Sequence, residues 1–549
     1  MTNKVKGAYY TPTALTDFMI KHIATGIKKK QVTILEPSVG DGAFIGSLKY
    51  FSEINKRAKF DFVGVERDKV EIEKAKLRSI SANPSFTFNF HNNDFLLISN
   101  NLTNNFDVVI GNPPYIKKSL LEQEQIQLCT AIHDSALLSK KAIRNIWPSF
   151  LIRSTQLLND NGILAMVLPA DLLQVSFSGE LRQFLKNEFQ RLEIFTFDDL
   201  LFECKGQDTI LVFGYKQSDE SGQFYTNISH LDQLMKNEFK LIINAGLAET
   251  DTKWSHHYLS TDDLFFLEEL RSKTKTMSHY VNSKPGVVTG ANEFFIVDSK
   301  TESRYSLYNN TYPILQKATY VGKQINFTQS DYDRIYAEGK PSKLLALKSA
   351  VNTAGSILLK RYIAEGKESG LPEKHKCSIR NLWYVVPNVA KPAQAIFFKR
   401  SNHYPKLILN SAQVLVTDVG YMVSMKDGLD VKDLVFSFYN SLTFLFAELT
   451  GRFYGGGVLE LTPKEFKNIP IPFMRCSDEQ FADFVSAFGK GTTNNPTLND
   501  KIILKDYFKL SDSEIQRIIN IKNQLVLKRS TKTSGSSQIS INESTSSLY

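Results

Sequence analysis

Short apolar segments alternate with amphipathic helical patterns from residue 13 to about residue 215. Apolar side chains recur at helical spacing in residues 13–27, 69–80 and 148–158. Seven apolar runs between such segments predict β-strands, at residues 32–36, 60–66, 86–92, 106–112, 163–169, 193–197 and 209–215. Several runs are apolar at nearly every position, which is typical of strands covered by helices on both faces. We therefore predict a doubly wound α/β fold around a mostly parallel, seven-stranded sheet.

The pattern changes twice further along the chain. The loop at residues 198–208 is too short for a crossover helix, so the seventh strand should pair antiparallel with its neighbour. After about residue 245 short strands, aromatic clusters and Gly/Pro-rich loops predict a mixed α+β domain, and helical spacing returns at residues 479–527. We expect four parts: an α/β domain at 1–245, the mixed domain at 246–475, a small helical C-terminal segment at 476–528 and a disordered tail at 529–549.

Composition narrows the class of protein. Lys plus Arg exceed Asp plus Glu by 66 − 57 = +9, and the resulting pI of about 9.0 favours an anionic partner such as nucleic acid. The four cysteines lie far apart without a CxxC pair, so we expect no metal site and a reducing compartment. No secretory leader or apolar run of about 18 residues is present, which predicts a cytoplasmic protein without a membrane contact.

Three acidic residues follow three successive predicted strands. Glu36 ends the first strand and precedes a glycine turn formed by Gly40 and Gly42, which permits close approach of a ligand. Glu66 ends the second strand, where a carboxylate typically meets ribose hydroxyls, and Asp94 follows the third. Each acid alone could simply cap the next helix. Together they favour a neutral or cationic nucleoside over a pyrophosphate.

The fourth strand runs into Asn112, Pro113, Pro114 and Tyr115. Two prolines in sequence restrict the backbone, so the Asn112 side-chain oxygen and the Pro113 carbonyl form a rigid pair of hydrogen-bond acceptors. Such a pair suits an exocyclic amine, whose two N–H groups it could accept. Tyr115 offers a ring on which a base removed from the duplex could stack. A rigid turn without chemistry is the alternative for this tetrapeptide in isolation.

Taken together, these motifs resemble the γ-class S-adenosylmethionine-dependent adenine-N6 DNA methyltransferases of restriction-modification systems. The resemblance implies a Rossmann-like methyltransferase domain, a target recognition domain and methyl transfer to adenine N6 in double-stranded DNA after base flipping. It implies that Phe202 sandwiches the flipped base opposite Tyr115. The cofactor residues it implies are Tyr10, Thr11, Pro12, Glu36, Pro37, Gly40, Gly42, Glu66, Asp94 and Phe95, with Asp94 and Phe95 at the cofactor adenine.

The second domain combines basic and aromatic residues, which suits phosphate contacts and strand opening. We expect DNA contacts from Arg361, Arg380, Lys399 and Arg400, although each basic cluster alone could be a solvated face. Enzymes of the same chemistry act on protein glutamine or ribosomal RNA, but they usually lack such a domain. A cytosine-N4 enzyme also stays open, although Asn before the prolines resembles the adenine enzymes.

A fused restriction nuclease is a further alternative. In the fusions used for comparison the nuclease precedes the N-terminal cofactor motif, whereas only six residues precede Gly7 here. We therefore expect any cognate restriction endonuclease to be a separate chain. A monomer is slightly favoured.

Overall fold

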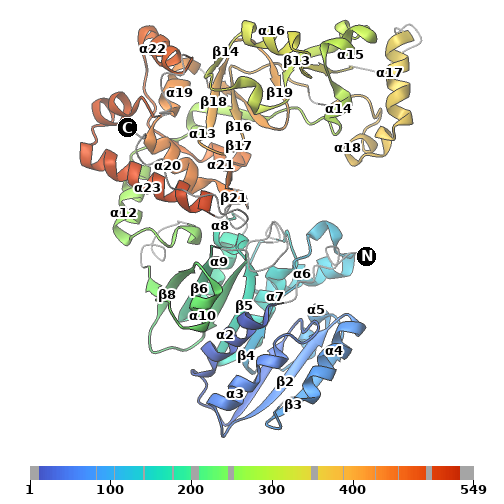
Figure 1. Cartoon of the computed structure of the whole chain (residues 1–549), viewed down its shortest axis with the longest axis vertical. Helices are drawn as coiled ribbons and strands as arrows, with labels where there is room; N and C mark the ends of the chain where they lie inside the picture. The colour runs from blue at the N-terminus through green and yellow to red at the C-terminus, as the bar shows by residue number, and fades with distance from the viewer. Residues whose placement is uncertain are drawn as a thin grey trace. The chain divides into compact units, whose positions relative to one another are not determined.

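The chain is described by a computed structural model and divides into two compact units, which meet in sequence between Leu267 and Glu268 (Figure 1). The expected boundary at residue 245 and most of the expected tail lie outside the described residues. The residues that the structure describes run from 11 to 531, with gaps at 82, 104, 140–142, 176–177, 199–208, 245–252, 348–356, 388, 427, 455–456 and 490–496.

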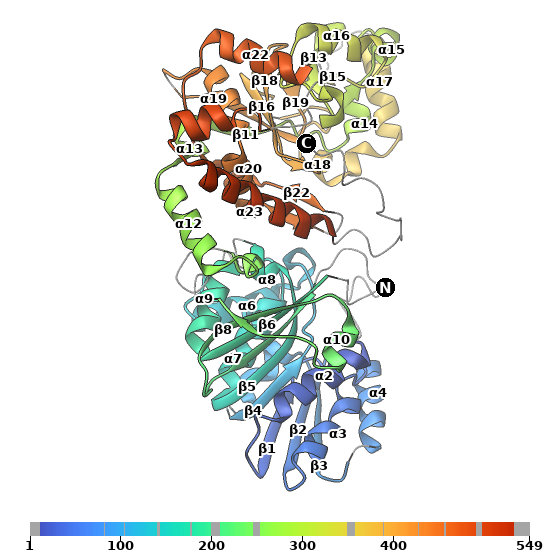
Figure 2. The ribbon, with the colours of Figure 1, turned by 60° about the vertical axis from the view of Figure 1, so that its left-hand side comes forward.

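The first unit is built on one large sheet with the strand order β3-β2-β1-β4-β5-β7-β6-β8-β9 (Figures 1 and 2). The predicted α/β fold and its mostly parallel, doubly wound sheet are confirmed. β7 pairs antiparallel with both β5 and β6, also as predicted. The strands are β1 (Gln31–Glu36), β2 (Lys59–Glu66), β3 (Phe86–Asn92), β4 (Phe106–Gly111), β5 (Leu158–Pro169), β6 (Arg191–Phe197), β7 (Thr209–Tyr215), β8 (Gly222–Ile228) and β9 (Ile242–Ile243).

The sheet is larger than the predicted seven strands, because β8 pairs parallel with β6 and β9 pairs antiparallel with β8. The polar residues within β8 and the shortness of β9 hid both strands from the apolar pattern. β5 also begins at Leu158, five residues before the predicted start at 163, because Leu158 pairs with Phe106 across a register shift. Tertiary pairing thus extends strands into segments whose local sequence resembles a turn.

Helices cover both faces of this sheet. Ile34, Val108 and Ala165 are fully buried in the cluster that also contains the apolar face of α2. Val109 and Leu164, which point to the opposite face, are equally buried on the side where α7 packs against β4 and β5. The α-helices of this unit are α2 (Thr13–Ala24), α3 (Lys49–Ile54), α4 (Lys69–Ile80), α5 (Phe95–Ile98), α6 (Gln123–Ser135), α7 (Trp147–Leu157), α8 (Asp171–Gln174), α9 (Gly179–Glu188) and α10 (Leu231–Met235).

The second unit contains several smaller sheets, and the predicted mixed α+β architecture is confirmed. Its sheets have the orders β11-β20-β16-β18-β14, β12-β15-β13-β19, β17-β22-β21 and β10-β23. The strands are β10 (Lys275–Thr276), β11 (Val281–Pro285), β12 (Ile296–Val297), β13 (Thr311–Leu315), β14 (Asn326–Phe327), β15 (Lys343–Leu345), β16 (Ala395–Phe398), β17 (Arg400–Ser401), β18 (Lys406–Asn410), β19 (Leu415–Val416), β20 (Gly420–Met425), β21 (Arg452–Tyr454), β22 (Val458–Glu460) and β23 (Pro470–Ile471).

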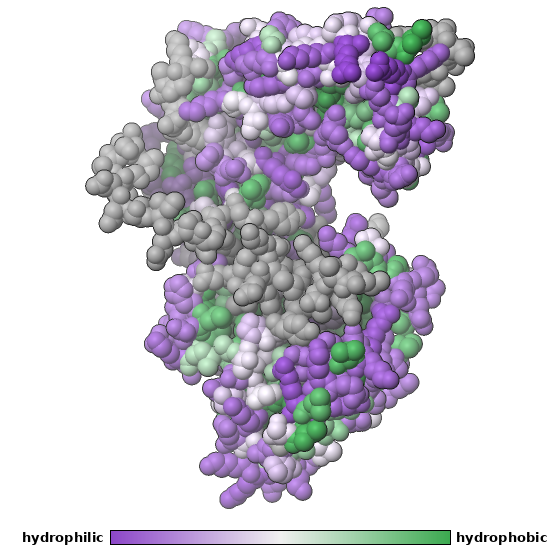
Figure 3. Space-filling view, turned by 45° about the vertical axis from the view of Figure 1, so that its right-hand side comes forward, coloured by the Kyte–Doolittle hydropathy of each residue, from purple (hydrophilic) through white to green (hydrophobic). Residues whose placement is uncertain are grey.

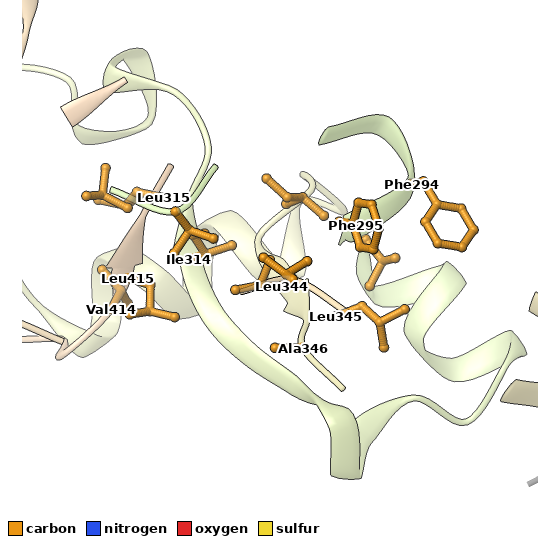
Figure 4. Packing of buried hydrophobic residues seen from close by; sticks show 14 of the residues in the cluster. Phe294, Phe295, Ile314, Leu315, Leu344, Leu345, Ala346, Val414 and Leu415 are labelled. Carbon is orange, nitrogen blue, oxygen red and sulfur yellow. The ribbon is translucent and has the colours of Figure 1, made fainter. Parts of the chain in front are cut away.

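Buried apolar side chains from distant segments form the core of this unit (Figure 4). Ile314 and Leu344 of the paired strands β13 and β15 are fully buried beside Phe295 of α14. The helices are α12 (Thr261–Ser272), which spans the division between the units, α13 (Met277–Tyr280), α14 (Asn292–Phe295), α15 (Ser299–Arg304), α16 (Gln329–Ala337), α17 (Ile357–Glu368), α18 (His375–Ser378), α19 (Val431–Phe438), α20 (Ser441–Thr450), α21 (Pro463–Lys467), α22 (Asp478–Gly489), the π-helix η10 (Lys501–Tyr507) and α23 (Asp512–Thr531).

α23 continues to Thr531, beyond residue 528, where we predicted the helical segment to end. The reason is Arg529, whose guanidinium is fully buried and bonds Glu448 of α20 through Nε at 3.0 Å and Nη2 at 2.9 Å. Its Nη1 donates to the backbone oxygens of Asn402, at 2.8 Å, and Gly457. The end of the helix is thus held by a buried ion pair that no local sequence pattern reveals.

The visible face of the molecule is mostly hydrophilic, with separate apolar patches rather than one continuous surface (Figure 3). Among the described residues, none of the helices is both long enough and apolar enough to cross a membrane. Within the same residues no group of three His, Cys, Asp or Glu side chains is arranged to hold a metal ion.

Candidate active site

Four parallel strands bring the predicted chemical residues to one edge of the large sheet. In the order β3-β2-β1-β4, Glu36 ends β1, Glu66 ends β2, and Asn112 directly follows β4. β1 and β4 are neighbours in space, and the strand order reverses between them, which is where ligands bind in doubly wound sheets. The Ser38 hydroxyl donates to the backbone oxygen of Asn112 at 3.0 Å, so the glycine turn and the Asn-Pro-Pro-Tyr segment are directly connected.

The turn after β1 is ordered by Glu66. The backbone N–H of Gly40 donates to Glu66 Oε2 at 2.9 Å, and that of Asp68 donates to Oε1 at 2.8 Å. Gly40 has φ +56°, a left-handed conformation that favours glycine, although a Cβ atom there would meet no neighbour within 4 Å. Gly42, with φ +87°, also allows close packing, because its Cβ would lie 3.0 Å from Ala75 Cα in α4. The turn therefore has an open side at Gly40.

Glu36 is a buried acid, and the groups that act on it within the described part of the chain are further acids. Its side chain is 1% exposed, and among the described residues its Oε2 has no hydrogen-bond partner. Burial, followed by the nearby carboxylates of Glu66 and Asp41, raises the pKa of Glu36 well above its ordinary value. An unpaired buried acid is costly in the free protein, so a ligand that brings a cation or N–H donors fits this position.

Asp94 and Phe95 have local structural roles in addition to any contact with a ligand. Asp94 caps α5, since its Oδ1 accepts from the Leu96 N–H at 3.0 Å, and its Oδ2 accepts from Gln125 Nε2 at 2.9 Å. The Phe95 ring is 2% exposed and packs on Phe150, with the ring centres 5.1 Å apart. The capping alternative is thus realised at Asp94, and its role toward an adenine amino group stays a prediction.

The Asn112 amide is held in a defined orientation by two neighbours. The Tyr115 hydroxyl donates to Asn112 Oδ1 at 2.8 Å and lies 3.0 Å from the carbonyl oxygen of Val167 in β5. On the other side, Asn112 Nδ2 donates to Thr11 Oγ1 at 3.2 Å. These contacts link the segment before α2, the end of β4 and the end of β5. The amide oxygen of Asn112 therefore faces Tyr115, and the amide nitrogen faces Thr11.

Tyr115 is more enclosed than its predicted stacking role requires, because the whole residue is only 8% exposed. Thr11, also 8% exposed, lies at Asn112, and Pro12 precedes the first turn of α2. Tyr10 and Phe202, the predicted cofactor and stacking aromatics, lie outside the described residues. Sequence reasoning missed Ser38 and Val167, because a serine within a turn and a backbone carbonyl carry no recognisable signal.

Each of the four predicted DNA contacts of the second unit is engaged within the chain. Arg380 donates to the backbone oxygens of Thr289, at 2.6 Å, and Trp383, at 3.2 Å, so it ties two loops together. The other three each lie near a carboxylate: Arg361 Nε is 3.1 Å from Glu365, Lys399 Nζ is 3.8 Å from Asp418 and Arg400 Nε is 2.9 Å from Glu460. Arg361 and Arg400 are more than half exposed and could exchange these partners for phosphate.

Comparison with known proteins agrees with this arrangement in both units. A family profile described as Eco57I restriction-modification methylase matches residues 20–202, and one described as the C-terminal domain of Type II methyltransferase M.Eco57I matches residues 251–504. The two profiles match different parts of the chain, and both describe methyltransferases of the Eco57I type. The predicted family, a methyltransferase of the restriction-modification type, is thereby confirmed.

Individual members of this group differ in how much of the chain they match. Type II methyltransferase M.AccI from Acinetobacter calcoaceticus is 21% identical over 493 residues, which cover 86% of this chain and 87% of that protein. Type II methyltransferase M.BanIII from Aneurinibacillus aneurinilyticus is 26% identical over 231 residues, which cover 39% of each chain. The solved structure of the Type IIL restriction-modification enzyme MmeI in complex with DNA covers 95% of this chain and 73% of its own, with a TM-score of 0.53 at 13% identity. At this level of identity, the likeness to MmeI shows a shared fold.

Proposed function

We propose that this protein transfers a methyl group from S-adenosylmethionine to N6 of adenine within a specific sequence of double-stranded DNA. The observation that carries the proposal is the Asn112 amide, oriented by Tyr115 and Thr11 at the point where the strand order reverses. The match to the methylase profile supports DNA methylation, and the choice of adenine rests on the Asn-Pro-Pro-Tyr motif.

S-adenosylmethionine fits the residues at the edge of the sheet. Its cationic methionine part would offset the buried charge of Glu36, with Thr11, Pro12, Pro37 and Gly40 nearby. Glu66, which already orders the turn, would accept from the ribose hydroxyls, and Asp94 with Phe95 would hold the adenine. When bound, the cofactor supplies a methyl group on a positively charged sulfur, which is a good leaving group.

The chain then has to orient the adenine amino group rather than activate a side-chain nucleophile. A planar amine has two N–H donors, and the Asn112 oxygen and the Pro113 carbonyl would accept one each, which raises the electron density on nitrogen. Pro114 fixes the backbone of this pair. The Tyr115 hydroxyl holds the amide oxygen of Asn112 at 2.8 Å, and its ring would contact the flipped base. Catalysis on this scheme is largely positioning.

DNA is the expected partner of both units. The solved structure of MmeI contains DNA, and the net charge of +9 in this chain suits a polyanion. We propose that the second unit recognises the target sequence and that any cognate endonuclease is a separate chain. The relative RM.Eco57I is named as both restriction enzyme and methyltransferase, but its match covers only 20% of that protein.

The decisive experiment is to sequence genomic DNA, with detection of modified bases, from cells that express the protein or its Asn112→Ala variant. We expect N6-methyladenine at one sequence motif with the wild type and none with the variant. The purified variant should still bind S-adenosylmethionine, because Asn112 contacts the target amine rather than the cofactor. Tyr115→Phe is the matched control: it keeps the ring but removes the bond to Asn112, so we expect a slower but measurable rate.

Each contrary result has a defined meaning. Unimpaired methylation by Asn112→Ala would overturn the mechanism. Methylated cytosine in place of adenine would retain the chemistry but correct the base. Unmodified DNA together with methylated protein or RNA in the same cells would replace DNA as the substrate.

A further inference from the structure

The segment that directly follows the catalytic motif is fixed in place by a neighbouring segment. After Tyr115, the backbone oxygen of Ile116 accepts from the N–H of Ile146 at 3.0 Å, and the N–H of Lys118 donates to the backbone oxygen of Arg144 at 3.0 Å. Lys117 and Asn145 form an antiparallel bridge between these bonds. The short helix η3 (Lys118–Leu120) then completes the segment. Residues 117–120 are therefore held close to the Asn112 site by backbone bonds, independently of their side chains.

This segment and Arg144 gather positive charge at the protein surface. Lys117, Lys118 and Arg144 are exposed, and within the described part of the chain their side chains take part in no hydrogen bond or ion pair. The nearest acid in the sequence, Glu122, accepts from Arg67 at 3.2 Å. The predicted DNA contacts Arg361, Lys399 and Arg400, in contrast, each have a carboxylate partner. Unpaired cations are the ones available to a polyanion.

An exposed leucine lies within the same short helix. Leu120 is 60% exposed, and it follows Lys117, Lys118 and Ser119, which are exposed as well. Proteins that open a duplex place apolar side chains against the bases that become unstacked, and Leu120 offers such a side chain beside the Asn112 site. Lys117, Lys118 and Leu120 lie two to five residues after Tyr115. Cations together with one apolar side chain suit a DNA strand from which a base has been flipped out.

We propose that Lys117, Lys118 and Arg144 bind the backbone phosphates beside the target nucleotide, and that Leu120 contacts the bases from which that nucleotide has been withdrawn. This inference rests on the proposed function and names the part of the methyltransferase unit that holds the target strand. Phosphate contacts position the duplex without reading its sequence. The second unit is then required for recognition, and this segment for delivering the amine to Asn112.

The test compares two triple variants that remove the same charge from the same unit. One is Lys117→Ala/Lys118→Ala/Arg144→Ala, and the control is Lys28→Ala/Lys30→Ala/Lys59→Ala. The control lysines are exposed and precede or begin β1 and β2, at the opposite edge of the sheet. Both variants are assayed on a duplex that contains the motif found by modified-base sequencing, over a series of salt concentrations, together with S-adenosylmethionine binding.

The first variant should bind the duplex roughly tenfold or more weakly, and the slope of log affinity against log salt should fall by about 0.9 for each lost phosphate contact. Its affinity for S-adenosylmethionine should be unchanged. Leu120→Ala should slow methylation of paired adenine, and a mismatch opposite the target adenine should restore the rate. Equal slopes and affinities for the two triple variants would overturn the phosphate contacts. A Leu120→Ala rate that the mismatch does not restore would overturn the role of the leucine.

Failure of this inference is distinguishable from failure of the proposed function. If the wild type does not methylate DNA, the proposed function is wrong and the segment has no such role. If the wild type methylates DNA and the two triple variants behave alike, only the assignment of this segment is wrong.

Discussion

Two buried glutamates, one in each unit, differ in whether their charge is compensated by a neighbouring group. Glu448 is 6% exposed and is bonded by Arg529 through two nitrogens, at 3.0 and 2.9 Å. Glu36 is 1% exposed, has one oxygen without a partner among the described residues and faces further acids. A paired buried charge becomes costly when its partner is removed, whereas an uncompensated one is a standing cost that a bound ligand would relieve. Burial and hydrogen bonding alone thus distinguish Glu36 from Glu448, without reference to any sequence motif.

The largest effect that the comparison predicts comes from removing the compensating partner in the second unit. Arg529→Met would leave Glu448 buried and unpaired, and the backbone oxygens of Asn402 and Gly457 would lose their donor. We expect the free energy of unfolding of this unit to fall by about 3–5 kcal/mol. Urea unfolding measures the loss, and faster amide hydrogen exchange in residues 512–530 would locate it at α23.

The control for that prediction removes both charges together. Arg529→Met/Glu448→Leu no longer contains an unpaired carboxylate, so it should recover a large part of the stability lost in the single variant. If the single and double variants are equally destabilised, the ion pair is not what holds α23 in place. S-adenosylmethionine binding should be unaffected in both variants.

The same substitution placed at each glutamate should give opposite results, with a smaller effect than the loss of Arg529. Glu36→Gln removes an uncompensated charge, so the free protein should be at least as stable as the wild type. Its affinity for S-adenosylmethionine should fall by about 10- to 100-fold, equivalent to one or two charge-assisted hydrogen bonds. Glu448→Gln should instead lower stability and leave that affinity unchanged. Urea unfolding and calorimetric titration with the cofactor measure the two properties.

A contrary pattern would be informative. Lower stability of Glu36→Gln with unaltered cofactor affinity would mean that Glu36 is part of the fold, and the assignment of the cofactor site would have to be revised. Equal responses of the two glutamates would remove the distinction altogether.

The sequence predicted the first unit far better than the second, for a physical reason. Strands covered on both faces by helices need apolar side chains at nearly every position, and the edge strand β3 alternates apolar and polar ones, so β1 to β7 are visible in the pattern. The strands of the second unit are short, several have only two or three residues, and their pairing depends on partners distant in sequence. Only the class of the second unit could therefore be predicted.

The candidate site shows the same division. Strand ends and glycine turns placed Glu36, Gly40, Glu66 and Asn112 at one edge, as the parallel sheet requires. The sequence could not show that Tyr115 bonds Asn112, because that contact depends on how the chain bends after Pro114. Nor could it show that Arg380 is engaged by loop carbonyls, since a buried role and a DNA contact use the same residue type.

The smallest expected effect is on the pH dependence of stability. Burial, then the charges of Glu66 and Asp41, raises the pKa of Glu36 in the folded protein, so the folded chain holds a proton that the unfolded chain releases above its ordinary pKa of 4.5. Because the folded state binds more protons in that window, the contribution of Glu36 to stability falls as pH rises from 4.5 through its folded pKa. Glu36→Gln lacks this contribution, so its stability relative to the wild type should increase with pH.

Other carboxyl groups with a raised pKa, including that of Glu448, titrate alike in the wild type and in Glu36→Gln. Their contributions therefore cancel in the difference between the stabilities of the two proteins. Saturating S-adenosylmethionine brings a cation to the wild-type site and favours the charged carboxylate, so it should flatten the wild-type profile. Urea unfolding at a series of pH values, with and without the cofactor, measures both changes. A difference between wild type and variant that does not vary with pH would show that Glu36 is already compensated in the free protein, and the contrast with Glu448 would fail.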